Sequence, residues 1–422
     1  MLRGGSMRAD HPLVVLVDAY GTGRHLRAAF AGLGAEVVHV SSTPEPLPSL
    51  KAPDLGSYAA ALVSADPVLT ARRLAALRPA AVVAGQEPGV PLADVLSEML
   101  GLPTNGSALS SARRDKYLMI EAVRKAGVRC ARQFRSDDVD AVAAWARKQG
   151  GRPVVVKPLA ASGAQGVSIC TDPAEVRGAA EAILGTVTMY GETNAEVLAQ
   201  SYLAGTEYIV DTVSCRGERY DAGVWRYDKR RRGARNVSHR DVLVAPDDPV
   251  VAELTAYTHD VLDALGIEFG AAHAEVMMTA DGPALVEIGA RMNGAMHPDF
   301  DAACCGADQA RASALAWLRP DQFAEEFAGR TYRRLQEAFV YHVATDLAGI
   351  VASVDASVLA EIDAVESVRA VTVKPGPGDR LRPTVDLPSS PLTVHMAHAD
   401  AAALARDQAR VLALSKEVFR LA

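Results

Sequence analysis

The stretch from His273 to Gly294 constrains the fold of this chain most, because it sets two carboxylates on the two sides of one turn. Two apolar runs of strand length flank an Asp-Gly turn signal at 281–282, which predicts a β-hairpin with Glu275 on one arm and Glu287 on the other. If the loop has an odd number of residues centred on Asp281, the two glutamates lie directly opposite each other on one face, with Cβ atoms about 5 Å apart.

Two glutamates that face each other repel, so their pairing needs an explanation. A divalent cation can lie between them, one of them can be protonated, or the register can slip by one residue and send one side chain to the other face. Arg291 lies two strand steps beyond Glu287 on the same face, and it adds a donor for phosphate oxygens to the metal interpretation. The hairpin alone leaves the three explanations open.

Composition indicates an ordinary globular protein of two or three domains. The chain has 422 residues, of which 49% are apolar and 23% are charged. Its net charge of -7 argues against a nucleic-acid partner, since such proteins need an excess of Lys and Arg. One basic run is an exception, and we expect it to be a solvated loop, with a loop that faces phosphate or substrate as the alternative: Lys229, Arg230, Arg231, Arg232 and Arg235.

The five cysteines predict reduced thiols in a cytoplasmic protein. Their number is odd and no CxxC spacing occurs, which disfavours both a disulfide framework and a zinc site. We expect the adjacent pair Cys304 and Cys305 to be small buried residues, with redox activity as the alternative. No apolar run approaches the ~20 residues that cross a bilayer, so no membrane partner is expected.

The N-terminal segment shows the alternation of a doubly wound α/β domain. A continuous apolar run at 13–18 predicts a buried strand, and a glycine turn, a helix at 24–33 and a second strand at 37–40 follow. The dinucleotide fingerprint is incomplete because Leu26 stands at the third glycine position, so a tight turn explains Gly21 and Gly23 without NAD.

Two lysines upstream of the hairpin are candidates for binding an anion. A predicted helix at 111–126 carries Lys116 on the same face as Ile120 and Val123, where the lysine either meets an anion or extends its aliphatic stem past apolar neighbours. Lys157 ends a predicted strand, and a loop of small residues at 159–166 joins it to another strand. No Walker motif is present, so any phosphate contact here needs backbone N–H groups and this lysine.

The remaining segments complete a three-part organisation. Glu207 follows a turn between two apolar strands, where it either accepts ribose hydroxyls or faces solvent at a sheet edge. The last hundred residues predict a small α+β unit. We expect an α/β domain at 1–112, a central domain at 113–325 with a lid at about 155–210, and the α+β domain at 326–422.

Several of these features, in this order and spacing, resemble the ATP-grasp superfamily, and most closely its branch of bacterial L-amino acid ligases. The resemblance implies an ATP-grasp fold with an N-terminal doubly wound, biotin-carboxylase-like domain and a small C-terminal α+β domain. It is carried by Lys116, Val156-Lys157-Pro158, the loop Ser162 to Val167, Gly205-Thr206-Glu207, Glu275, and Glu287 to Arg291, with Gly85 to Val90 and Ala112 to Tyr117 for the first domain.

The resemblance implies ATP as a ligand, held between phosphate-binding lysines, a closing loop, an adenine-binding hinge and a ribose-binding glutamate. Gln200 stands where many family members have an acidic hinge residue. This difference has little effect on adenine binding if backbone groups of the hinge bind the base. The implied nucleotide residues are Lys116, Lys157, Ser162, Gly163, Gly166, Gln200, Ser201, Tyr202, Leu203 and Glu207.

The same resemblance implies Mg²⁺, or Mn²⁺ in its place, as the metal. Glu275 and Glu287 would bind it, and Arg291 would stabilise the phosphorylated intermediate, so that Lys157, Glu287 and Arg291 form the implied catalytic set. Many members of the family have Asn at the position of Gly289. The substitution would leave a second Mg²⁺ with one protein ligand fewer.

The implied reaction is the joining of two amino acids, or of an amino acid and a small amine, through an acyl phosphate with release of ADP. The alternatives are another ATP-grasp ligase, such as a carboxylase or a purine-type synthetase, and a nucleotide-binding regulator without turnover. The expected partners are small amino acid substrates and a second copy of the chain, since dimers are the common oligomer.

Residues that flank the metal site are the candidates for the acyl-substrate pocket. His273 is as compatible with a hydrogen-bonded core histidine, and the methionines with packing. Arg240 and Asp241 are expected to contribute from the basic loop. The candidates are His273, Arg291, Met292, Asn293, Met296 and His297.

Overall fold

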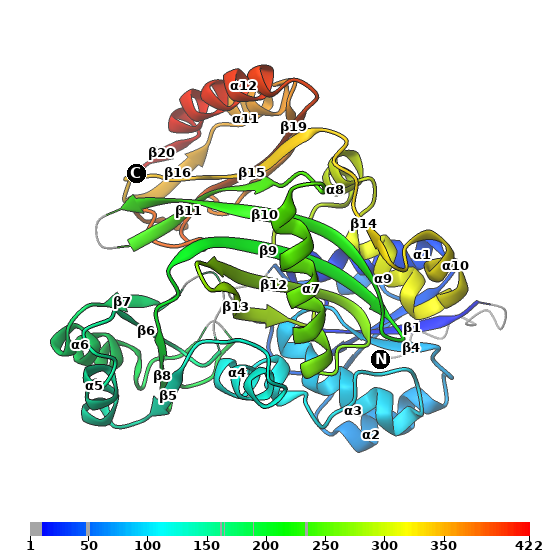
Figure 1. Ribbon diagram of the computed structural model, residues 1–422. Coiled ribbons are helices and arrows are strands. Elements are labelled where there is room, and N and C mark those ends of the chain that lie inside the picture. The colour runs from blue at the N-terminus through cyan, green and yellow to red at the C-terminus, as the bar shows by residue number, and fades with distance from the viewer. Residues whose placement is uncertain (1–10, 48–50, 161–162, 164, 189, 233–234) are drawn as a thin grey trace.

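The computed structural model describes residues 11–47, 51–160, 163, 165–188, 190–232 and 235–422. Figure 1 shows the described chain as a central twisted sheet, with the N-terminal domain and a smaller lid at its lower side and the C-terminal unit above it. Among the described residues, no helix has the length and apolar character that a membrane span needs.

The N-terminal domain is built on a four-stranded parallel sheet of order β3-β2-β1-β4. Side chains of β1 alternate between two hydrophobic cores: Val14 and Leu16 pack on the α1 side, and Val15 and Val17 on the side of α2 and α3. The predicted doubly wound start is confirmed. Its elements are β1 (Leu13–Val17), α1 (Arg24–Gly32), β2 (Glu36–Ser41), β3 (Ala60–Val63), α2 (Pro67–Ala75), β4 (Ala81–Ala84) and α3 (Val90–Leu100).

The predicted helix at 111–126 is two elements. A 3-10 turn at Ser111–Arg113 is followed by α4 (Lys116–Lys125), because the Asp115 side chain accepts the backbone N–H of Leu118 and starts a new helix. Lys116 therefore lies in the first turn of α4, where it is buried.

The lid subdomain is a four-stranded antiparallel sheet of order β5-β8-β6-β7 with two helices packed on it. The two strands predicted to flank the loop at 159–166 are present and pair antiparallel. The elements are β5 (Gln133–Ser136), α5 (Val139–Arg147), β6 (Val154–Lys157), β7 (Ser168–Cys170), α6 (Pro173–Ile183) and β8 (Val197–Ser201).

The central sheet has the order β13-β12-β9-β10-β11-β15-β19-β17, with β14 paired to β10. It runs without a break from the predicted glutamate hairpin into strands of the C-terminal unit, through the pairing of β11 with β15. Its strands are β9 (Gly205–Cys215), β10 (Glu218–Arg232), β11 (Arg235–Leu243), β12 (Phe269–Thr279), β13 (Gly282–Gly289), β14 (Arg330–Thr331), β15 (Glu337–Val343), β17 (Val368–Val373) and β19 (Leu392–His398).

Helices cover this sheet and connect it to the other parts. Asp308 caps α9 by accepting the backbone N–H of Arg311, and α9 packs against α1 of the N-terminal domain. The helices are α7 (Pro249–Ala264), α8 (Pro298–Cys305), α9 (Gln309–Leu318), α10 (Pro320–Glu326), α11 (Ala356–Asp363) and α12 (Ala401–Leu414).

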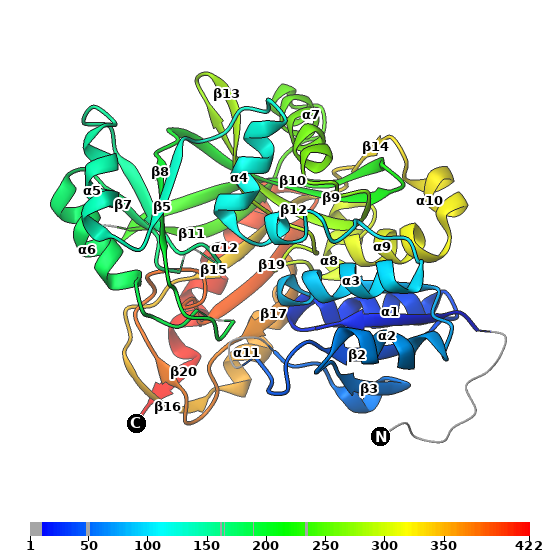
Figure 2. The same cartoon turned by 90° about the horizontal axis from the view of Figure 1, so that it is seen from below.

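The C-terminal unit adds a small antiparallel sheet of β16 (Gly349–Val354), β18 (Arg380–Leu381) and β20 (Phe419–Leu421). Figure 2 shows the molecule from below, with this unit and the N-terminal domain on the two sides of the view. The cysteines are free, and Cys304 and Cys305 are buried with their sulfur atoms 3.6 Å apart, as expected for small core residues.

The basic run is not a solvated loop over its described part, so that prediction was wrong. It lies at the paired ends of β10 and β11, where Lys229 is opposite Ser238 and Arg230 is opposite Val237. Cross-strand pairing orders these residues, and the side chain of Lys229 is directed to a carboxylate of the neighbouring strand.

Candidate active site

A large cavity lies between the lid and the central sheet. Its volume is about 1060 Å³, at the upper end of the range for small-molecule pockets. Residues of β6, β7, α6 and β8 line the lid side, and residues of β9, β10, β12 and β13 line the sheet side. The predicted phosphate lysines, hinge residues, ribose glutamate and facing glutamates all line this one cavity.

The two glutamates face each other, but through a route that the sequence did not predict. Thr279 pairs with Gly282, so the loop has two residues and not an odd number. This register would place Glu275 opposite Val286. A β-bulge shifts the register between Glu275 and Val276, so that Glu275 pairs with Glu287 and Val286 is the extra residue.

The two predicted lysines lie next to Glu287, one at its carboxylate and one at the preceding carbonyl. Lys116 Nζ lies 2.8 Å from Glu287 Oε2, and Lys157 Nζ donates to the carbonyl of Val286 at 3.5 Å. Burial raises the pKa of Glu287, but Lys116 and Lys157 outweigh it and hold the pKa below its ordinary value. Burial and the charge of Lys116 lower the pKa of Lys157 to about 8.

Glu275 has the opposite electrostatic environment. Tyr227 donates its hydroxyl to Glu275 Oε1 at 2.9 Å. Burial, followed by the charges of Glu287 and Glu207, raises the pKa of Glu275 to about 7. The pKa of one glutamate is thus raised and that of the other is lowered. Because the two residues are paired, a register slip is excluded, and a shared proton or a bound cation remains to explain why two carboxylates face each other.

The donor set fits Mg²⁺ held jointly by protein and nucleotide. Mg²⁺ usually takes one or two carboxylates and completes its octahedron with phosphate oxygens and water. Within the described ranges, no group of three or more His, Cys, Asp or Glu side chains is arranged to hold a metal. Two facing carboxylates beside two lysines match that incomplete protein ligation.

We expect Mg²⁺ with ADP to raise the melting temperature more at about pH 8 than at about pH 6. The raised pKa of Glu275 contributes stability below the pKa of the unfolded chain, and this contribution disappears as the pH rises through about 7. A cation bound to the ionised pair offsets that loss. Melting curves recorded between about pH 6 and about pH 8, with and without Mg²⁺ and ADP, measure the effect. Glu275→Gln should make the increase in melting temperature independent of pH. An increase that is already independent of pH in the wild type contradicts the prediction.

The predicted hinge and ribose residues line the same cavity. Gln200, Ser201, Tyr202 and Leu203 line it where β8 ends. Glu207 lies across from them and accepts a hydrogen bond from Lys229 Nζ at 2.6 Å. A ligand that binds Glu207 through hydroxyl groups therefore meets a lysine of β10 as well.

The glycines of the predicted closing loop are conformationally required. Gly163 has φ +68°, and a Cβ there would lie 2.9 Å from Pro388 Cδ of the C-terminal unit. Gly166 has φ +71°, and its Cβ would lie 3.0 Å from Pro158 Cγ. Ser162, predicted to contact phosphate, lies outside the described residues.

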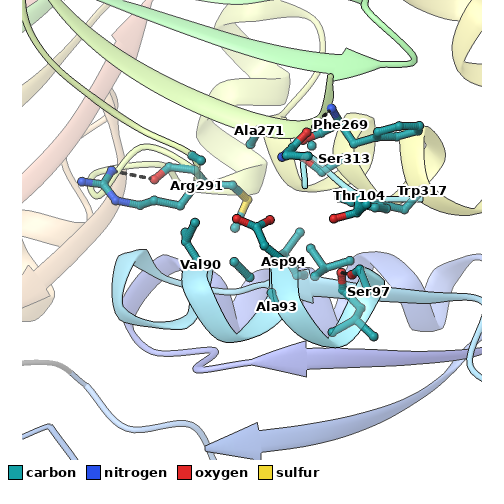
Figure 3. A pocket seen from close by; sticks show the side chains of 18 residues that line it. Val90, Ala93, Asp94, Ser97, Thr104, Phe269, Ala271, Arg291, Ser313 and Trp317 are labelled. Atoms are coloured by element: carbon teal, nitrogen blue, oxygen red, sulfur yellow. Dashed lines mark hydrogen bonds between the residues drawn. The ribbon is translucent and has the colours of Figure 1, made fainter. Parts of the chain in front are cut away.

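Arg291 does not continue the strand as predicted, because β13 ends at Gly289. Its Nη1 donates to the carbonyl of Met292 at 2.9 Å, and its Nη2 lies 3.5 Å from Glu87 Oε2. Figure 3 shows the side chain turned away from Asp94 and the small cavity beside α3. A Cβ on Gly289 would lie 3.3 Å from Arg291 Cζ, so the glycine leaves room for the guanidinium.

The predicted substrate residues divide into two groups. His273 Nδ1 and Asn293 Nδ2 each lie 2.8 Å from a carboxylate oxygen of Asp211, which gives His273 the core role weighed as its alternative. Met292 and Met296 are 2% and 4% exposed and pack in the core shared with the N-terminal domain, so we do not carry them into the proposed substrate pocket.

The other candidates lie toward the C-terminal unit. His297 is the residue directly before α8, and its ring centroid lies 5.5 Å from that of His395. Arg240 pairs with Asp228 at 2.6 Å, and Asp241 lies 2.7 Å from His342 Nε2. Both residues are in β11 and not in a loop.

Several residues that contact the predicted site residues, or one another, were not assigned a role from the sequence, among them Glu87, Tyr190, Asp211 and Tyr227. Asp211 lies opposite His273 on the neighbouring strand, and the Tyr227 hydroxyl reaches Glu275 from β10. Both contacts become visible only once the order of the strands is known. Glu87 had a local signal, since Gln86-Glu87-Pro88-Gly89 interrupts the βα alternation directly after β4. Tyr190 had none.

Comparison with known proteins decides the family. Residues 151–299 match the model of the ATP-grasp domain. Dapdiamide A synthase of Enterobacter agglomerans is 35% identical over 398 residues, which cover 92% of each chain. The chain belongs to the ATP-grasp family.

Solved structures of ATP-grasp proteins have the same fold over nearly the whole chain. L-amino acid ligase from Bacillus licheniformis superposes with a TM-score of 0.75 at 18% identity, covering 99% of this chain and 100% of that one. The biotin carboxylase domain of 2-oxoglutarate carboxylase from Hydrogenobacter thermophilus, solved with MgADP and bicarbonate, has a TM-score of 0.65 at 16% identity, covering 97% and 90%. The predicted ATP-grasp fold with a biotin-carboxylase-like first domain is confirmed.

Within the ATP-grasp family, this chain is an ADP-forming carboxylate–amine ligase. Its reaction is the ATP-dependent formation of an amide bond. The predicted activity class is confirmed, and the alternatives of a carboxylase, a purine-type synthetase and a regulator are not favoured.

Proposed function

We propose that this ATP-grasp ligase joins the carboxylate of one amino acid, or of an amino acid derivative, to the amine of a second, using ATP with Mg²⁺. The observation that carries the site is the bulged pairing of Glu275 with Glu287 beside Lys116 and Lys157. The substrate class is supported by the printed names of two relatives, a dapdiamide synthase and an L-amino acid ligase.

The charges in the cavity match the two ends of a nucleoside triphosphate. Glu275 and Glu287 would hold Mg²⁺, and Lys116 and Lys157 would bind the phosphates, because they converge at the same end of the cavity. The hinge at 200–203 and Glu207 would bind adenine and ribose at the other end. When bound, Mg²⁺ neutralises phosphate oxygens and supplies electrostatic stabilisation for phosphoryl transfer.

The chain's own residues supply position and charge for two successive steps. In the first, an oxygen of the substrate carboxylate attacks the γ-phosphorus and ADP leaves; Lys157 and Arg291 would stabilise the charge on the transferred group. In the second, the amine nitrogen attacks the acyl carbon, phosphate leaves, and the nitrogen releases a proton. Because an acyl phosphate reacts with water, closure of the lid over the cavity is part of the mechanism.

A phosphate-release screen over pairs of amino acids, followed by mass spectrometry of the products, tests this proposal. We expect phosphate release that requires both members of a pair, with a product whose mass equals their sum less one water. Phosphate release without any condensation product across the screen contradicts the amino acid assignment. The predicted homodimer is tested on the same preparation by sedimentation analysis.

A further inference from the structure

A short segment of the lid subdomain reaches across to the N-terminal domain. It comprises the described residues 186–188 and 190–194, between α6 and β8, and we call these residues the strap. Gly185 N–H donates to Asn194 C=O at 3.0 Å and Thr188 N–H donates to Glu192 C=O at 2.7 Å, so the strap is a compact hairpin. Because both of its ends join lid elements, α6 and β8, the strap belongs to the lid subdomain.

The tip of the strap is bound to the N-terminal domain through Tyr190. Its ring is 7% exposed and packs with Tyr20 and Leu47. Its hydroxyl donates to Glu87 Oε2 at 3.4 Å. Burial, with a contribution from the charge of Glu87, raises the pKa of Tyr190, so the hydroxyl keeps the proton that it donates.

A second contact fixes the strap to the segment that carries a phosphate lysine. Arg114 Nη2 lies 2.8 Å from Glu192 Oε1, and Arg114 Cζ lies 5.5 Å from the centroid of the Tyr190 ring. Arg114 precedes the cap of α4 by one residue, and Lys116 follows that cap. The strap therefore contacts the N-terminal domain and also Arg114, which lies just before the N-terminus of α4.

The oxygen that accepts from Tyr190 also faces Arg291. Glu87 Oε2 lies 3.5 Å from Arg291 Nη2, and both side chains are almost fully buried. The charge of Glu87 is the main factor that raises the pKa of Arg291 against the effect of burial. One carboxylate oxygen thus connects a residue of the moving lid to the arginine beside the metal glutamates.

We propose that Tyr190 is a positioning residue that couples closure of the lid to the placement of Arg291, through Glu87. This inference rests on the proposed function. With the strap docked, Tyr190 holds the Glu87 carboxylate and Glu87 orients the guanidinium of Arg291. With the lid open, Glu87 loses Tyr190, Arg291 loses its fixed partner and water gains access to the acyl phosphate.

The test is the number of amide products formed per ADP, measured with the amino acid pair found in the screen. Tyr190→Phe keeps the ring and removes the hydroxyl. We expect its amide-to-ADP ratio to fall about threefold to tenfold, with the melting temperature and the Kd of MgADP unchanged. A purely structural role would instead lower the melting temperature and total turnover together and leave the ratio as in the wild type.

The matched control is Tyr58→Phe. Tyr58 is similarly buried in the N-terminal domain, and its hydroxyl has no hydrogen bond within the part of the chain that the structure describes. We expect this variant to keep the wild-type ratio. Glu87→Gln should lower the ratio as Tyr190→Phe does, and the double variant should lower it no further, because both changes break one connection. An unchanged ratio in both Tyr190→Phe and Tyr190→Ala overturns the proposal.

A second measurement needs no turnover and separates this inference from the proposed function. Failure of every amino acid pair in the screen would count against the proposed substrates alone. Hydrogen exchange of the backbone amides at 186–194, measured with MgADP, reports whether the strap is docked. Faster exchange in Tyr190→Ala than in wild type and Tyr58→Phe supports the docking; equal exchange in all three overturns it.

Discussion

Glu287→Gln is expected to lower ADP formation by at least about a hundredfold with Mg²⁺ in excess. Glu287 faces Glu275 across the bulged hairpin and accepts Lys116 Nζ at 2.8 Å. The neutral amide leaves the cation with one anionic ligand and leaves Lys116 without its charged partner at that oxygen. The measurement is the initial rate of ADP release with the substrates identified in the screen.

The control for this change is Glu326→Gln. Glu326 lies on α10, away from the cavity, where Oε2 pairs with Arg311 at 2.6 Å on the surface. Exposed pairs of this kind contribute little, so we expect a wild-type rate. If Glu287→Gln also forms ADP at the wild-type rate with Mg²⁺ saturating, the metal assignment is wrong.

Lys157→Met is expected to lower ADP formation to a similar extent, about a hundredfold or more, without loss of stability. Burial and Lys116 lower the pKa of Lys157 to about 8, which means that the folded protein disfavours its charge in the absence of phosphate. Methionine fills a similar volume and removes the repulsion between the lysines. The melting temperature should therefore stay equal or rise while activity disappears.

Lys125→Met is the matched control, because Lys125 is exposed at the end of α4. It should keep both the activity and the affinity for MgADP. A Lys157→Met variant that loses activity and melting temperature together would assign Lys157 a structural role. Isothermal titration with MgADP and melting curves distinguish the two outcomes.

Local patterns in the sequence were sufficient for the elements and for most of the nucleotide site. The apolar run at 13–17 predicts a strand buried on both faces, and Asp308 predicts a helix start, because each depends on neighbours in sequence. The spacing of Lys116, Lys157 and Glu207 relative to the glutamate hairpin resembled the ATP-grasp pattern, and the structure places them around one cavity.

Predictions failed where pairing between distant segments decides the geometry. The turn at 280–281 has two residues, which is an even number. Glu275 and Glu287 are opposite each other only because the β-bulge at Val286 shifts the register by one residue. The basic run was expected in solvent, yet Lys229 binds Glu207 because the pairing of β9 with β10 brings their side chains together. Charge alone predicts exposure and cannot anticipate a buried partner on another strand.

The sequence by itself therefore determined the family, the class of reaction and the residue types that surround the phosphates, since these depend on motifs and their order. The tertiary structure decided which carboxylate faces which, where Arg291 points, and that a lid residue reaches Glu87. Tyr190 and Glu87 are 103 residues apart in the chain. Neither has a local pattern that depends on the other, so their contact exists only once the lid and the N-terminal domain are packed together.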